Sequence, residues 1–97
     1  MAKLEVEVRP AAGVGGYSLF VDGVPAEMGA DHKGEVGCAG RCGDGSLHTL
    51  LYSFSGSPGA TLSITLRCAL TIVCRIRAET KGEGGPPWRA GREAFVI

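Results

Sequence analysis

The chain has 97 residues, a length that fits one domain with a single hydrophobic core. Its ten basic and ten acidic residues cancel, so no net field concentrates the protein on nucleic acid or on an anionic membrane. A hydrophobic content of 44% argues against global disorder, and no apolar run approaches the roughly 20 residues of a membrane span. We therefore expect one soluble domain, residues 1–97, that binds neither nucleic acid nor membrane.

The first half of the chain contains a clear strand and a hairpin. Residues 3–9 alternate between apolar and charged side chains, which predicts a strand with one buried face. Residues 17–28 predict a hairpin, because Asp22-Gly23 is a preferred two-residue turn. Residues 29–46 are rich in glycine and polar side chains and have no period, so we expect a long loop there. Such loops are uncommon in compact domains and are usually functional or mobile.

The second half alternates more regularly. Residues 47–54, 60–68 and 70–78 predict strands, residues 80–91 form a Gly/Pro-rich connection, and residues 92–97 predict a last strand. The positions expected to point into the core are Leu62, Ile64, Leu66, Cys68, Leu70, Ile72, Cys74 and Ile76.

No window has a helical period, and turn signals recur roughly every ten residues. About seven short strands of this kind predict an all-β fold, namely a small antiparallel β-sandwich that is Ig-like or barrel-like. In an immunoglobulin domain the tryptophan lies between two cysteines and packs on their bridge. Trp88 follows all four cysteines here, so that likeness is limited to architecture.

The loop cysteines, Cys38 and Cys42, are spaced C-x3-C, which zinc sites permit. Together with His32 and either His48 or Asp31, they would make a small metal- or ligand-binding domain with zinc as its cofactor. The histidine spacing matches no known zinc pattern, so we favour plain reduced thiols. A disulfide is the remaining alternative, and a bridge from the loop to a strand would stabilise more than one between Cys38 and Cys42.

The strand cysteines, Cys68 and Cys74, are interpreted as packing residues of the core. A three-residue connection at 69–71 would place Cys74 opposite Leu66 and leave the two sulfurs diagonal, which is too far for a relaxed disulfide. The N-terminus passes from Met1 directly into the alternating pattern without a secretory leader. We therefore expect a cytoplasmic protein with reduced thiols.

Catalytic motifs are missing from the sequence. It contains no phosphate-binding loop, dinucleotide fingerprint or G-x-S-x-G element. A pair of Cys42 with His48 or His32 is the one nucleophilic site that the spacing leaves open. We expect that the protein is not an enzyme.

Three arginines, Arg67, Arg75 and Arg77, fall on the predicted outward face of neighbouring strands. They would form a basic stripe that Arg89 and Arg92 extend. Guanidinium groups suit carboxylate or phosphate ligands, whereas the face lacks the aromatic side chains that single-stranded nucleic acid needs. The alternative is a solvated strand face that discourages aggregation at the sheet edge.

Trp88 follows Pro86-Pro87 and precedes Arg89, a combination typical of interface hot spots, although the ring would serve equally well as a lid over the core. Asp44 resembles part of a calcium loop but lacks the distal Glu, which favours an Asp-Gly turn; it is kept as a candidate binding residue.

The leading interpretation is a non-enzymatic module that recognises a protein partner through the loop 29–46 and the segment 84–92. A homodimer through an exposed edge strand is one form that this recognition would take.

Overall fold

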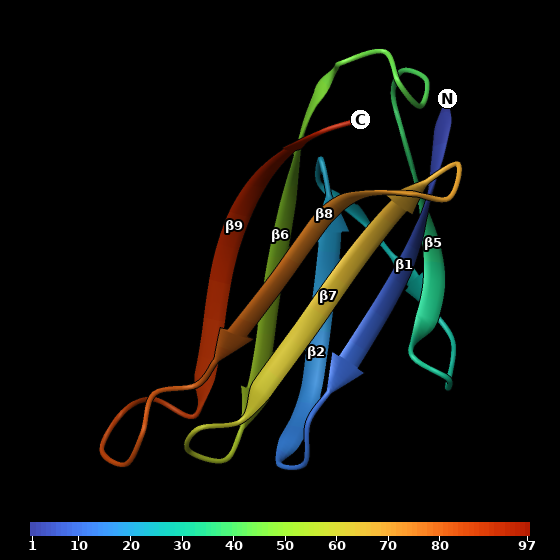
Figure 1. The fold of residues 1–97 in the computed structure, drawn as a ribbon. Coiled ribbons are helices and arrows are strands. Elements are labelled where there is room, and N and C mark those ends of the chain that lie inside the picture. The colour runs from blue at the N-terminus through green and yellow to red at the C-terminus, as the bar shows by residue number, and fades with distance from the viewer.

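The computed structural model describes all 97 residues as two antiparallel sheets packed face to face (Figure 1). The strand order is β4-β5-β1-β7-β8 in the five-stranded sheet and β3-β2-β6-β9 in the four-stranded sheet. Seven strands have six residues or more, which confirms the predicted small antiparallel sandwich. The strands are β1 (Ala2–Pro10), β2 (Val14–Val21), β3 (Val24–Pro25), β4 (Glu27–Met28), β5 (Lys33–Cys38), β6 (Leu47–Gly56), β7 (Thr61–Cys68), β8 (Thr71–Glu79) and β9 (Trp88–Val96).

The core follows from the two-residue alternation of the strands. On β7, Leu62, Ile64 and Leu66 are fully buried, while the residues between them lie on the outer face. The four-stranded sheet contributes large side chains from β2, β6 and β9, and together the sheets bury a cluster of 18 apolar residues. No helix in the structure has the length and apolar character that crossing a membrane requires.

The β7–β8 hairpin corrects the prediction for two apolar residues. Its turn has two residues, Ala69 and Leu70, both with positive φ, so Cys68 pairs with Thr71 rather than with Ile72. A bulge after Leu66 then restores the predicted pairing of Leu66 with Cys74. Leu70 therefore lies exposed in the turn and Ile72 faces outward beside Arg67, although the alternation predicted both in the core.

The predicted loop 29–46 contains a strand, β5, which pairs with β1 along its whole length. The sequence hides it because Gly34 and Gly37 interrupt the alternation. At Gly34 a Cβ would collide with the carbonyl oxygen of Glu27 on the neighbouring strand β4. The glycine permits this close approach of the two backbones, and the predicted loop is reduced to a turn at residues 29–32 and an irregular segment at residues 39–46.

Strand β9 begins at Trp88, four residues earlier than the expected start at Arg92. Gly91 interrupts the apolar–polar alternation of this strand. A glycine is needed here because the residue faces Tyr52 on β6 so closely that a Cβ would collide with the phenol oxygen. Trp88 consequently belongs to a strand at the edge of the four-stranded sheet and not to the preceding connection.

The two segments expected to carry recognition are separated along the sandwich. Loop 39–46 lies at the end that also holds both termini, whereas the β8–β9 connection lies at the other end (Figure 1). Leu47 at the end of this loop pairs with Val96, and Trp88 pairs with Ser55 at the far end of β6. The eight intervening steps along β6 correspond to roughly 26 Å.

The hydroxyl of Thr80 ties the β6–β7 connection to the end of β8. Thr80 is buried; its Oγ1 accepts a hydrogen bond from the N–H of Ala60 (3.0 Å) and donates one to the carbonyl of Ser57 (2.6 Å). We expect Thr80→Val to lower the free energy of unfolding by about 1–3 kcal/mol, because it leaves buried polar groups with fewer partners. Denaturant unfolding measures this loss, and Thr80→Ser, which keeps the hydroxyl, should lose clearly less. Equal losses in the two variants would contradict the assignment.

Candidate functional site

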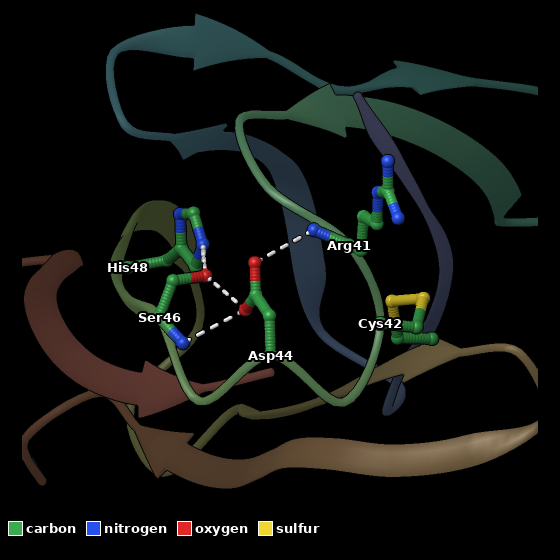
Figure 2. The surroundings of a disulfide bond; sticks show 6 residues. Arg41, Cys42, Asp44, Ser46 and His48 are labelled. Atoms are coloured by element: carbon green, nitrogen blue, oxygen red, sulfur yellow. Dashed lines mark hydrogen bonds between the residues drawn. A yellow bond between two sulfur atoms is a disulfide. The ribbon is translucent and has the colours of Figure 1, made fainter.

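Loop 39–46 is organised around the carboxylate of Asp44. The carboxylate accepts hydrogen bonds from the backbone N–H groups of Arg41 and Ser46, both at 2.8 Å, and from the Ser46 hydroxyl at 2.6 Å (Figure 2). The Arg41 guanidinium points away, so only the backbone of that residue takes part. Gly40 has a φ of +94°, and a Cβ there would stand 2.5 Å from the carboxylate. The loop is therefore built to surround this side chain.

These three donors stabilise the charged form of Asp44. The hydrogen bond from the Ser46 hydroxyl, followed by those from the backbone N–H groups of Arg41 and Ser46, lowers its pKa from 3.8 to about 2. The sequence-based interpretation of this residue as an Asp-Gly turn is consistent with the bonds, since an Asp side chain that binds nearby backbone N–H groups is a turn-forming device.

His48 connects the loop to the β2–β3 turn through the interior. Its side chain is only 4% exposed, and the ring lies between Ser46 Oγ, 2.9 Å from Nε2, and Asp22 Oδ2, 2.5 Å from Nδ1. Asp22 also accepts the N–H of Thr49 at 2.9 Å. The hydrogen bond with His48, and then the one from Thr49, lower the pKa of Asp22. We call Asp22, Asp44, Ser46 and His48 the carboxylate–histidine clamp.

The order Ser46, His48, Asp22 matches that of a Ser-His-Asp triad, but the protons are distributed differently. In a hydrolytic triad the histidine accepts the serine proton. Here the Ser46 hydroxyl donates to the Asp44 carboxylate, so it meets His48 as an acceptor. The geometry is that of a polar clamp in which the Ser46 proton is directed to Asp44 and not to His48, so the serine is not activated.

A disulfide between Cys42 and Cys68 closes the same end of the molecule (Figure 2). Its Cα atoms are 5.6 Å apart, and it joins the exposed loop to the buried end of β7. The favoured interpretation of four reduced thiols is therefore wrong for this pair, and Cys68 is a bridge residue as well as a core residue. A bridge from the loop to a strand was the alternative with the larger stabilising effect.

The remaining cysteines, Cys38 and Cys74, are free and buried. Burial raises the pKa of the Cys38 thiol. Burial, and then the nearby carboxylate of Glu93, raise the pKa of the Cys74 thiol to about 11. Both groups stay protonated near neutral pH and lack the thiolate character of a nucleophile. Since Cys42 is bridged, the proposed pair of Cys42 with a histidine does not form.

The four candidate zinc ligands do not converge on one site. Cys42 is oxidised, His48 belongs to the clamp, and Cys38 is buried in β5. His32 lies in the β4–β5 turn, where its Nδ1 is 2.7 Å from the Tyr17 hydroxyl. No three His, Cys, Asp or Glu side chains in the structure are grouped so that they could hold a metal ion. The zinc hypothesis with these residues therefore lacks structural support.

The predicted arginine stripe lies on the outer face of the five-stranded sheet. Arg67, Arg75 and Arg77 come from β7 and β8, and only Arg67 has an ion-pair partner, Glu7 at 3.6 Å. The predicted extension of the stripe is wrong for Arg92. Arg89 bends toward the five-stranded sheet and donates to the carbonyl of Glu79 at 3.3 Å. Arg92 pairs with Leu51 and belongs to the outer face of the other sheet.

Trp88 also belongs to that other outer face, which we call the apolar face. Trp88 is 58% exposed, so it does not act as a lid over the core. Strand register places 14 residues of the four-stranded sheet on this face, and Arg92 is the only charged one. They are Gly16, Ser18, Phe20, Pro25, Leu47, Thr49, Leu51, Ser53, Ser55, Trp88, Ala90, Arg92, Ala94 and Val96.

The sequence indicates Trp88 as an interface residue but not the surface around it. The available signal was the pattern of residues 47–54, where Leu47 and Leu51 make the second side of the strand partly apolar.

Comparison with known proteins finds no matching family model, no matching curated protein and no matching solved structure.

We expect the disulfide to stabilise the fold by about 3–4 kcal/mol, since it closes a loop with a sequence separation of 26. Cys42→Ser should lower the free energy of unfolding by that amount, because the exposed position tolerates serine. Dithiothreitol should destabilise the wild type to the same level and leave Cys42→Ser unchanged. A variant that reductant destabilises further would point to a different pairing of the cysteines.

The lowered pKa of Asp44 predicts an acid-induced loosening of the loop. A carboxyl group whose pKa is lower in the folded state stabilises the fold above its unfolded value of 3.8, and this effect is lost as the pH falls toward about 2. In NMR spectra the amide protons of Arg41 and Ser46 should titrate together with a midpoint near 2, and Asp44→Asn should abolish that transition. A midpoint near 4 would show that the three hydrogen bonds to Asp44 do not form in solution.

Proposed function

We propose that the protein is a non-enzymatic interaction module that binds a protein partner through the apolar face. The observation that supports this proposal is the composition of that face. Among the outward-facing residues of β3, β2, β6 and β9, only Arg92 carries a charge. Extended apolar surface of this kind marks sites of protein interaction. The proposal retains Trp88 and the segment 84–92 as binding residues. It replaces loop 29–46, as the second part of the binding surface, by residues of β2 and β6.

The two outer faces of the sandwich differ sharply in charge. The outer face of the five-stranded sheet carries Glu5, Glu7 and Lys33 beside the arginines. On the apolar face, by contrast, exposed Leu47 pairs with Val96, and Leu51 lies between Phe20 and Arg92. Covering these side chains gains about 25 cal/mol for each Å² of apolar surface removed from water.

Trp88 provides an anchor at one end of this face. Beside it, the small residues Gly16, Ser18, Ser53 and Ser55 line a hollow of about 370 Å³. A partner side chain that enters this hollow would contact the indole ring, which is the arrangement of a hot spot with a large aromatic surface. The partner we propose therefore presents a largely uncharged surface with one protruding apolar side chain.

The expected homodimer through an edge strand remains part of this proposal. β9 is an edge strand of the sheet that carries the apolar face, and the backbone groups on its outer side have no strand partner. Pairing through this edge would use backbone groups and not the apolar face, so self-association is measured separately from partner binding. The disulfide favours an oxidising compartment, in conflict with the cytoplasmic location expected from the N-terminus.

A charge-insertion experiment tests the apolar face. Leu51→Lys places a second charge at its centre, and Trp88→Ala removes the anchor. Ile72→Lys is a matched control on the opposite face, because Ile72 is 42% exposed and Leu51 is 39% exposed. Quantitative capture from the native host and light scattering at two protein concentrations measure partner binding and self-association.

We expect Leu51→Lys and Trp88→Ala to lower recovery of the partner at least tenfold, while Ile72→Lys binds like the wild type. Each lost apolar anchor contributes about 1.5–3 kcal/mol, which corresponds to roughly a tenfold effect or more. If all variants recover the same proteins in equal amounts, the apolar face is not the interaction surface.

A further inference from the structure

A basic hollow of about 500 Å³ lies on the outer face of the five-stranded sheet, away from the apolar face. It is formed over β1, β7 and β8, and its lining contains four arginines and two hydroxyl residues. These residues are Arg9, Arg67, Arg75, Arg77, Ser63 and Thr65. We call this site the arginine hollow.

Strand register explains why a hollow forms at this point of a flat sheet. Ser63 on the central strand β7 pairs with Arg9 on one side and Arg77 on the other. Thr65, two residues further along β7, pairs with Arg75. Short hydroxyl side chains thus form the floor and long guanidinium side chains form the walls. Arg9 and Arg77 have Cα atoms roughly 10 Å apart, and Arg75 and Arg77 roughly 7 Å apart.

The hollow has an excess of positive charge that the protein does not neutralise. Glu7 is the single carboxylate in the lining and serves two arginines, Arg9 at 2.9 Å and Arg67 at 3.6 Å. Arg75 and Arg77 form no ion pair. The site therefore carries three uncompensated positive charges in a chain whose net charge is zero. Like charges gathered on one face of a sheet repel one another, and an anion bound between them would relieve this repulsion.

The lining defines the chemistry of a suitable counter-charge. A guanidinium group binds an oxyanion through two parallel N–H donors, and the hydroxyls of Ser63 and Thr65 add further donors at the floor. The separation of the arginines suits several oxyanion groups within one ligand. No aromatic side chain lines the hollow, so bases or sugar rings find no stacking surface there.

We propose that the arginine hollow binds a small ligand with clustered phosphate or sulfate groups, recognised by Arg75 and Arg77 together with the hydroxyls of Ser63 and Thr65. Glu7 orients Arg9 and Arg67 but also repels the ligand. This site is independent of the proposed protein interaction, because the two surfaces lie on opposite faces of the sandwich.

Isothermal titration calorimetry in metal-free, low-salt buffer tests the site with two probes, tripolyphosphate and a persulfated disaccharide. We expect saturable binding at one site for at least one probe, and the preferred probe identifies phosphate or sulfate as the ligand group. Arg75→Gln/Arg77→Gln should weaken binding at least tenfold. The matched control Arg41→Gln/Lys81→Gln removes the same charge from exposed residues outside the hollow and should change affinity by less than about twofold.

Glu7→Gln gives a readout of the opposite sign. It should strengthen binding severalfold, because the change removes the repelling carboxylate and frees two guanidinium groups. Circular dichroism verifies that each variant is folded. The proposal is overturned if neither probe saturates, if the two double variants weaken binding equally, or if Glu7→Gln lowers the affinity.

Discussion

Burial of one face of β7 is the constraint on which the rest of the structure depends. Leu62, Ile64 and Leu66 are fully buried, and β7 pairs with β1 on one side and β8 on the other. Because successive residues of a strand point to opposite sides, burying this face fixes the outer positions of β7 as well. The floor of the arginine hollow and the anchor of the disulfide at Cys68 are both consequences of this one register.

A different constraint holds loop 39–46, which buries no apolar side chain of its own. The loop is held instead by hydrogen bonds to Asp44, by the ring of His48 and by a covalent bond at Cys42. The chain end joins this arrangement, since the N–H of Ile97 donates to the carbonyl of Ser46 at 3.1 Å. Polar and covalent links replace the hydrophobic contacts that a glycine-rich segment cannot supply.

The sequence predicts those parts of this fold whose causes are local. Alternation and turn residues identify β1, β6, β7 and β8, because period and turn chemistry are properties of neighbouring residues. β5 and the start of β9 are not predicted, because each contains a glycine that interrupts the alternation. Gly34 and Gly91 are required by close contacts with Glu27 and Tyr52, which lie elsewhere in the chain.

The candidate sites show the same division between local and long-range causes. The outward direction of Arg67, Arg75 and Arg77 follows from strand period, but the bridge between Cys42 and Cys68 and the contact between Asp22 and His48 each join residues 26 positions apart. Four cysteines allow three complete pairings, and spacing alone does not choose among them. The apolar face is likewise a product of pairing, because Leu51 and Trp88 become parts of one surface only when β6 and β9 lie side by side. Surfaces that several strands share are therefore the features that a single sequence leaves undetermined, and in this protein they are also the features that carry the proposed binding.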